Sequence, residues 1–271
     1  MIYVLMMSFS AFAEQRKVAY KVTKGQTSLS LYAMTDIHVV NKYLEQYGLE
    51  AVEVAPGFAL TGVSVNYYKK GSVEFTGVPF KVGNYTTTYL PFLVKKPGSP
   101  LKSVYYFSET TTDGTFLRTV YGRMGINLYN GVFENVMNIA DVQGSQHFAT
   151  VHTKKCKIPV VSCQKELQLK IKAGMSDKHT WAKNPTFKLS ENSIVSSPAA
   201  EGTFKYSVSS FDFSGTQYTR EFDPKVDTYK FGEKTLQAKL FKEGGFIPTV
   251  WQYTVEADTV GYDSERVETL E

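Results

Sequence analysis

The chain has 271 residues and a formal net charge of +4, from 30 Lys and Arg against 26 Asp and Glu residues. Hydrophobic residues make up 42% of the chain and charged residues 21%, which is enough apolar material for a large core and excludes an intrinsically disordered protein. The excess positive charge is small and is not gathered in a basic run, so binding to nucleic acid is not expected.

The N-terminal segment is apolar and uncharged. It ends in Ala11-Phe12-Ala13, directly before Glu14. An apolar segment followed by a small-x-small sequence is typical of a secretory signal peptide, here without its positively charged leading region. A buried first strand is the alternative interpretation. We expect residues 1–13 to be a signal peptide truncated at its start, and residues 14–271 to form one periplasmic or secreted domain without a transmembrane segment.

The two cysteines agree with export. Cys156 and Cys163 bracket the short segment Lys-Ile-Pro-Val-Val-Ser, and a disulfide between them can close this loop in an oxidising compartment. Two free thiols are an alternative. A zinc site that includes His152 is another, although no convincing fourth ligand accompanies it. The sequence therefore predicts a disulfide, with no metal and no cofactor.

Alternation of apolar and polar residues runs through most of the chain and predicts strands with one buried face. It is clearest over residues 63–67, 167–171, 204–213, 236–240 and 251–255. A change of phase at Ser209 and Ser210 predicts a β-bulge. Loops are predicted at residues 95–100 and 192–202. The strands should form a large, mostly antiparallel sheet.

Two segments have helical rather than alternating spacing. Apolar residues recur every three to four positions between Val39 and Tyr47, with Thr35 as the candidate N-cap and Gly48 at a left-handed terminating position. A second helix is predicted from Asp113 to Tyr121.

Common catalytic motifs are absent from the sequence. It contains no glycine-rich phosphate loop, no Gly-x-Ser-x-Gly elbow and no His-Glu-x-x-His motif. His147 and His152 are the closest pair of histidines, but five residues along a strand place two side chains on opposite faces unless a bulge intervenes. Familiar hydrolase, nucleotide and zinc chemistry therefore has no support.

The stretch from Tyr85 to Phe133 contains two strand-like runs, an acidic turn, a short helix and the pair Gly122-Arg123. This order resembles the acetoacetate decarboxylase-like superfamily. The run from Val73 to Phe80 is similar to the earlier strand of that family, which carries a pocket carboxylate. The resemblance implies an α+β, mainly β fold: a large antiparallel sheet or cone-like barrel with two or three short helices.

The sequence departs from that family at the position that carries its chemistry. Decarboxylases of the family have a Gly-x-Pro-Lys-Lys run soon after Gly-Arg, in which one lysine forms a Schiff base. Residues 126–131 of this chain, Ile-Asn-Leu-Tyr-Asn-Gly, contain no lysine. An amide or phenol cannot form an iminium with a ketone, so decarboxylase activity is not expected.

The resemblance still implies a ligand pocket. Arg123 would hold a carboxylate or brace the pocket, and Glu74 would be a pocket acid or the ion-pair partner of Arg123. Asn127 and Tyr129 lie where the catalytic lysine would be and could donate hydrogen bonds to a carbonyl.

Three functions follow from these observations. The first is an exported protein, able to form oligomers, that binds a small organic acid or carbonyl compound. The second is an enzyme of lyase or hydrolase type that uses Glu74 for acid–base chemistry. The third is a structural or interaction module of the cell envelope.

Overall fold

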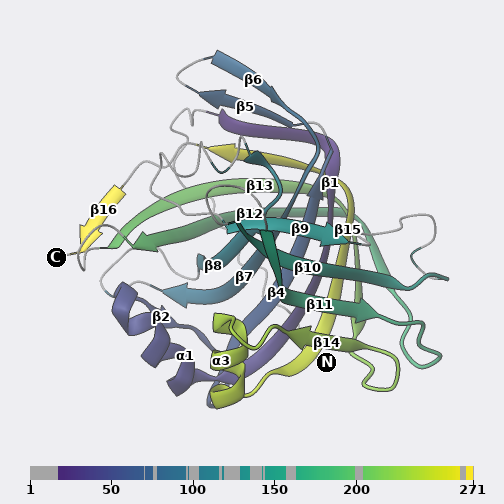
Figure 1. Ribbon diagram of the computed structural model, residues 1–271. Coiled ribbons are helices and arrows are strands. Elements are labelled where there is room, and N and C mark those ends of the chain that lie inside the picture. Colours follow the sequence, from purple (N-terminus) through teal and green to yellow (C-terminus); the bar gives the residue numbers. More distant parts are fainter. Residues whose placement is uncertain are drawn as a thin grey trace.

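The computed structural model describes residues 18–69, 71–75, 78–95, 97, 104–115, 118, 129–134, 142, 144–156, 163–198, 204–262 and 267–270. Most of these residues are in strands (Figure 1). The predicted signal peptide and most of the helix predicted from Asp113 lie outside the described residues.

The strands are β1 (Val18–Asp36), β2 (Glu50–Ala51), β3 (Glu53–Ala55), β4 (Phe58–Tyr68), β5 (Gly71–Phe75), β6 (Val78–Val82), β7 (Tyr85–Lys95), β8 (Val104–Thr112), β9 (Tyr129–Glu134), β10 (His147–Cys156), β11 (Cys163–Ala173), β12 (Ala182–Pro198), β13 (Phe204–Glu221), β14 (Thr228–Phe231), β15 (Ile247–Tyr262) and β16 (Val267–Leu270). The described helices are α1 (Ile37–Leu44), the short 3₁₀ helix η1 (Glu45–Tyr47) and α3 (Leu236–Gly244).

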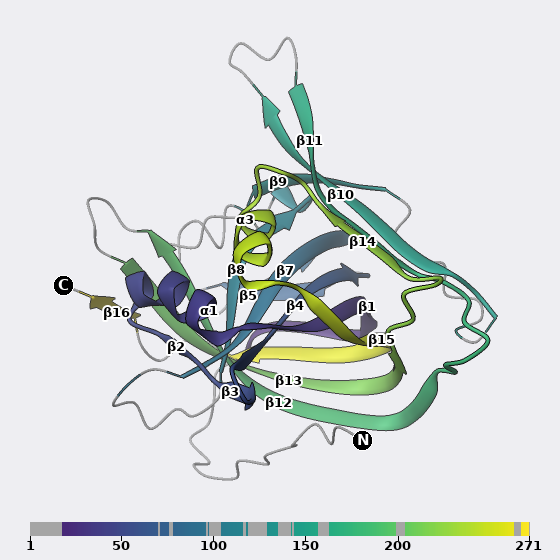
Figure 2. The ribbon, with the colours of Figure 1, turned by 90° about the horizontal axis from the view of Figure 1, so that it is seen from below.

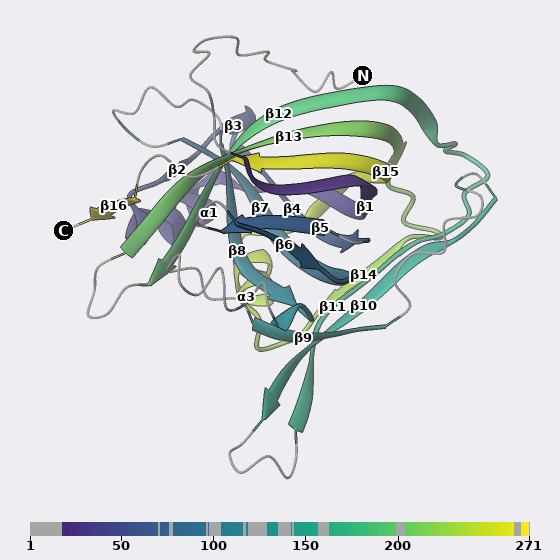
Figure 3. The ribbon, with the colours of Figure 1, turned by 90° about the horizontal axis from the view of Figure 1, so that it is seen from above.

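Seven long strands form the central part of the sheet. They pair in the order β12-β13-β15-β1-β4-β7-β8, and β8 also pairs with β12, so the path of pairings returns to its start. All of these pairings are antiparallel except that of β8 with β12. Figure 3 shows the strands converging at one end and fanning out at the other, as in a cone. The α+β, mainly β fold class with a large sheet is therefore confirmed.

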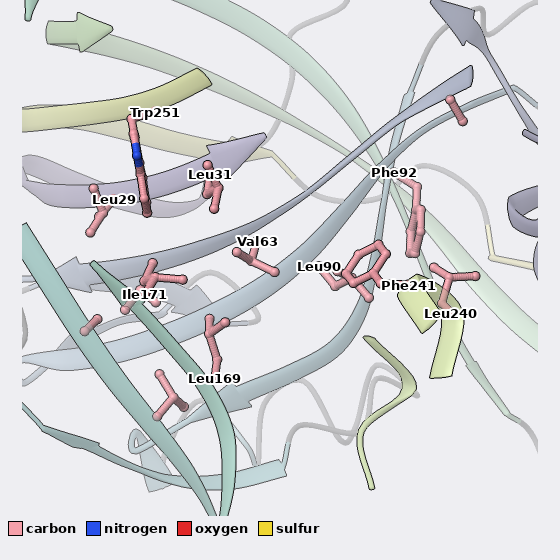
Figure 4. Packing of buried hydrophobic residues seen from close by; sticks show 14 of the residues in the cluster. Leu29, Leu31, Val63, Leu90, Phe92, Leu169, Ile171, Leu240, Phe241 and Trp251 are labelled. Carbon is pink, nitrogen blue, oxygen red and sulfur yellow. The ribbon is translucent and has the colours of Figure 1, made fainter. Parts of the chain in front are cut away.

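A second group of strands covers one face of this sheet. β9, β10, β11 and β14 follow β8 in the pairing order, and β10 and β11 form a long hairpin that projects from the body (Figure 2). Leu29 of β1 and Val63 of β4 point toward Leu169 and Ile171 of β11 (Figure 4). The hydrophobic core lies in this space. Burial of each large side chain there stabilises the fold by about 1.5–3 kcal/mol.

Helix α1 was predicted, but its cap differs from the prediction. Asp36, not Thr35, is the N-cap, and its Oδ1 accepts hydrogen bonds from the backbone N–H groups of His38 and Val39. Thr35 is fully buried at the end of β1, where its hydroxyl lies 2.8 Å from that of Thr61. The hydroxyl of Thr35 therefore bonds to the neighbouring strand β4 and does not cap the helix. The predicted terminator is confirmed, since Gly48 has a left-handed backbone (φ 60°).

The strand predicted over residues 236–240 is wrong, because this segment belongs to helix α3. Thr235 caps the helix by accepting a hydrogen bond from the backbone N–H of Ala238. Gln237, Leu240 and Phe241 are buried, which is the spacing of one helical face. The alternation of Leu236, Ala238 and Leu240 was a coincidence within that helical pattern.

Two predictions about β12 and β13 are also wrong. Pairing between these strands is regular from Phe204 to Gly215, so there is no bulge at Ser209 and Ser210. The irregularity follows Gly215, where an added Cβ would lie 2.8 Å from the Cα of Ala257. The loop predicted at residues 192–202 is a strand as far as Pro198. Both segments pair along their length, and that pairing outweighs the local preference of serine for turns.

Candidate functional site

A continuous row of polar residues crosses six neighbouring strands of the central sheet. Each residue is the direct register partner of the next, so all six side chains lie on the same face. We call these residues the polar row: Gln217 on β13, Thr254 on β15, Ser28 on β1, Asn66 on β4, Thr87 on β7 and Thr112 on β8.

The polar row is buried although it faces away from the hydrophobic core. Its six residues are between 0 and 8% exposed. The next row of residues, on the opposite face, includes Leu29, Val65 and Tyr253, which belong to the core. Strands with polar residues on one face normally turn that face to water. Here both faces are covered, so every polar atom of the row needs a partner.

Two neighbouring atoms of the polar row have no such partner. Ser64 lies 2.8 Å from Ser30 and donates to Oδ1 of Asn66 at 3.3 Å, and Thr112 donates to a backbone carbonyl at 2.8 Å. In contrast, Nδ2 of Asn66 and Oγ1 of Thr87 are buried without a hydrogen bond to any residue that the structure describes. Asn66 and Thr87 are register partners across β4 and β7. The row therefore offers two adjacent donors for an acceptor atom of a ligand.

An aromatic pair borders these two donors. Tyr68 and Tyr85 are register partners two residues further along the same strands, on the same face. Their rings stack with centroids 4.7 Å apart and planes inclined by 16°. Both are buried. They give the unpartnered amide and hydroxyl an apolar neighbour, which suits the carbon skeleton of a small molecule.

No side chain of the polar row can ionise. The nearest described carboxylate in sequence is that of Asp113, which follows Thr112 and accepts a hydrogen bond from the backbone N–H of Thr86 at 2.7 Å. Burial raises the pKa of Asp113, against the opposing effect of that hydrogen bond. The row can donate and accept hydrogen bonds, but it contains no amine that could form a Schiff base.

Of the four site residues predicted from the sequence, the structure describes Glu74 and Tyr129. Arg123 and Asn127 are not among the described residues. Glu74 lies in β5, opposite Pro79 of β6, and only its backbone is described. Tyr129 begins β9 next to β8, and it is 52% exposed. The site predicted at these four residues therefore stays a prediction.

A second polar centre holds the connection between β13 and β14. The side chain of Arg220 is 1% exposed and forms an ion pair with Asp227. The carboxylate of Asp227 also accepts hydrogen bonds from Trp251 Nε1 (2.9 Å) and from the backbone N–H groups of Gly174 (2.8 Å) and Asp223 (2.7 Å). Four donors around one carboxylate compensate for its removal from water.

The histidines do not combine into a metal site. His147 is fully buried and stacks on Tyr253 with ring centroids 4.5 Å apart, whereas His152 lies beside Glu134 at 3.9 Å. Burial raises the pKa of the hydroxyl of Tyr253, the ring on which His147 stacks. A register irregularity separates Val151 from His152, so a bulge does intervene. Within the described ranges, no group of three or more potential ligands could hold a metal ion.

The cysteines lie opposite each other near the end of the projecting hairpin. Cys156, the last residue of β10, is the register partner of Cys163, the first residue of β11. No free cysteine is found in the described part of the chain. Among the described residues, no helix is long and apolar enough to cross a bilayer.

No protein-family profile and no curated protein sequence matches the chain. Solved structures do. The enduracididine biosynthesis enzyme MppR in complex with pyruvate matches with a TM-score of 0.56 and 10% identity, over 96% of this chain and 92% of that one. Acetoacetate decarboxylase from Legionella pneumophila matches with a TM-score of 0.55 and 9% identity, over 98% and 93%. The chain has the acetoacetate decarboxylase-like fold.

The same fold is found in MppR with a bound HEPES buffer molecule, at a TM-score of 0.54, 9% identity, and 94% and 88% coverage. The predicted resemblance is therefore confirmed at the level of fold. At about one identical residue in ten, the likeness carries the arrangement of strands and does not transfer an activity. The chemistry must be argued from the residues of this chain.

The sequence carries a signal for the polar row beyond the alternation of apolar and polar residues. The segments around it are Thr-Ser-Leu-Ser, Ser-Val-Asn-Tyr, Tyr-Thr-Thr-Thr and Glu-Thr-Thr-Thr. Their polar positions are mostly small and uncharged, where solvent-facing strand positions more often carry Lys or Glu. Runs of Ser, Thr and Asn on the polar side of a strand indicate a face that is covered.

Proposed function

We propose that this chain is an exported protein of the acetoacetate decarboxylase-like fold that binds a small organic acid or carbonyl compound at the polar row, without decarboxylating it. The observation that carries the proposal is the pair of adjacent, buried and unpartnered donors, Asn66 Nδ2 and Thr87 Oγ1. A buried polar group without a partner costs about 1–3 kcal/mol. A ligand oxygen that accepts from both groups recovers this energy.

The chemistry of the row matches a carbonyl oxygen. Amide and hydroxyl donors hydrogen-bond to a ketone or carboxylate oxygen without transferring a proton, and the stacked rings of Tyr68 and Tyr85 offer an apolar surface to the carbon atoms. The structure of MppR that this chain resembles is a complex with pyruvate, which is both an organic acid and a ketone. This supports the proposed ligand class.

Binding is favoured over decarboxylation by the residue types. Schiff-base decarboxylation needs a lysine amine at the carbonyl, and the polar row has none. Residues 126–131, the position of the lysines in the resembling family, also contain no lysine. Acid–base turnover requires a group that exchanges protons near neutral pH, and amides and hydroxyls do not.

Isothermal titration calorimetry with pyruvate tests the proposal. Wild type should bind pyruvate saturably, and Thr87→Val should weaken binding by about tenfold, the loss of one hydrogen bond to a ligand. Thr27→Val is the matched control, because Thr27 is equally buried but faces the other side of β1. A wild type that does not bind, or equal binding by both variants, would overturn the proposal.

A second arm of this experiment concerns turnover. Wild type is incubated with acetoacetate, and released carbon dioxide is measured beside a family decarboxylase that has the lysine pair. We expect no release above the spontaneous rate. Enzymatic release would contradict the absence of decarboxylase activity.

Export and the disulfide form a separate part of the proposal. The register pairing of Cys156 with Cys163 supports a disulfide that ties the end of the hairpin. Intact mass of protein from its native compartment checks both points. We expect a chain that begins at Glu14 and gains two hydrogen atoms on reduction. A chain that keeps residues 1–13, or gains no hydrogen, would contradict the corresponding point.

A further inference from the structure

Two hollows lie beside the buried Arg220. The outer hollow has a volume of about 390 Å³ and the inner one about 30 Å³, and both are lined by His179, Thr180 and Arg220. The outer volume is within the range of small-molecule sites, and the inner one accommodates one small group. The segment between β11 and β12, residues 174–181, forms much of the wall.

Arg220 is held rigidly but keeps one donor unused. One terminal nitrogen pairs with Asp227, the other donates to the backbone oxygen of Gly174 at 3.1 Å, and the guanidinium lies 5.2 Å from the ring centroid of Trp181. Its Nε is buried without a hydrogen-bond partner among the described residues. A guanidinium fixed on two sides presents this N–H in one direction, with little entropy to lose on binding.

The wall of the hollow is also fixed in place. Ser176 donates to Asp223 at 2.6 Å and accepts hydrogen bonds from the backbone N–H groups of Lys178 and His179, both at 3.2 Å. The hydrogen bond from Ser176 lowers the pKa of Asp223, so this carboxylate stays ionised and bonded to the loop. The loop therefore holds its shape before any ligand arrives.

The charges of the outer hollow allow an anion to enter. Lys178 and His179 line it. The one carboxylate among its described lining residues, that of Glu221, is 78% exposed and lies 3.5 Å from His179 Nδ1. Asp227 and Asp223 carry negative charge nearby, but their oxygens are occupied by donors of the protein. An incoming carboxylate can therefore replace the weak, solvent-exposed Glu221 contact.

We propose that this hollow is a second binding site, which takes a small carboxylate whose oxygen accepts a hydrogen bond from Arg220 Nε and whose charge is balanced by Lys178. The polar row contains only neutral donors, whereas this hollow has cationic ones. The two sites therefore differ in selectivity: the row accepts a carbonyl or carboxylate oxygen through neutral donors, whereas the hollow favours a charged carboxylate. The proposal does not depend on the function proposed for the polar row.

Trp181 provides the readout for acetate binding. It lines the inner hollow, and the chain has only one other tryptophan, Trp251. Tryptophan fluorescence is followed while sodium acetate is added at constant ionic strength, with sodium chloride as the anion control and acetamide as the neutral control. We expect a saturable change with acetate alone. Equal responses to acetate and acetamide, or to acetate and chloride, would overturn the proposal.

Two variants assign the effect to this hollow. Lys178→Gln should weaken acetate binding severalfold, whereas Lys225→Gln, an exposed lysine that does not line the hollow, should leave it unchanged. Arg220→Lys keeps a positive charge beside Asp227 and removes the Nε donor, so it should abolish saturation if it folds. Equal acetate affinity of wild type and Lys178→Gln would contradict the site even if Arg220→Lys is unfolded.

Discussion

Asn66 and Thr87 face each other across strands β4 and β7, and each has a buried polar atom without a hydrogen-bond partner. Both lie in a row of six buried polar residues, in which Oδ1 of Asn66 and Oγ1 of Thr112 are hydrogen-bonded. An adjacent pair of unpartnered buried donors is the arrangement expected of a site that is completed by a ligand, because without one it only destabilises the fold.

The stability of Thr87→Val tests this interpretation. Removing an unpartnered buried hydroxyl should leave the free energy of unfolding unchanged or raise it by about 1 kcal/mol. Thr112→Val removes a hydroxyl that donates to Thr86 O at 2.8 Å, and it should lower the free energy of unfolding by about 1 kcal/mol. Urea denaturation of ligand-free protein measures both. A Thr87→Val protein as destabilised as Thr112→Val would show that the hydroxyl already has a partner.

Replacing Asp227 by Asn should be severe. The change leaves the guanidinium of Arg220, which is 1% exposed, without its charge partner, and a broken buried pair costs about 3–5 kcal/mol. Glu221→Gln removes the mostly exposed carboxylate of the residue that follows Arg220, and it should change the free energy of unfolding by less than about 1 kcal/mol. Thermal unfolding compares the two. Similar melting temperatures for both variants would mean that the Arg220 pair is not buried as described.

Asp223 should make stability depend on pH in the acid range. The hydrogen bond from Ser176 is the main cause of its lowered pKa. A carboxyl with a lower pKa in the folded chain stabilises the fold above its unfolded pKa of about 3.9, and this contribution is lost as pH falls through the folded value. The stability difference between wild type and Asp223→Asn should therefore be full near neutral pH and shrink below about pH 4. Denaturation curves across this range that keep a constant difference would contradict the assignment.

The cap of helix α1 gives a local test of the structure. Asp36→Ala removes the acceptor for two backbone N–H groups and should destabilise the protein by about 1 kcal/mol. His38→Ala, at an exposed position in the first turn, should have little effect. Chemical denaturation distinguishes the two. An Asp36→Ala protein as stable as His38→Ala would restore Thr35 as the cap.

The sequence predicted the fold well where one face of a strand is apolar. Val63 and Val65 in β4, and Leu169 and Ile171 in β11, alternate with polar neighbours and are core residues of strands. The prediction from the sequence failed over residues 236–240. Apolar residues occur there at every second position, but together with residues 237 and 241 the same stretch also fits one face of a helix.

Which residues form the polar row could not be predicted, because the row exists only through strand register. Ser28 and Thr254 are direct partners although they are far apart in the sequence, and no local pattern links them. Alternation also suggested that such positions face water, whereas the fold covers both faces. Glu74 and Tyr129 were predicted as site residues from the family resemblance. A resemblance of this kind indicates a region of the fold, and it does not identify the side chains that form the polar row.

The carbon-13 NMR spectrum of pyruvate labelled at its ketone carbon tests the central claim most directly. With wild type and with Thr27→Val, we predict a shifted resonance that is still that of a ketone, because the carbonyl is hydrogen-bonded and not covalently attached. With Thr87→Val at the same concentrations, most of the label should remain at the free position. An imine resonance in wild type, or the same bound ketone signal in all three proteins, would contradict the account.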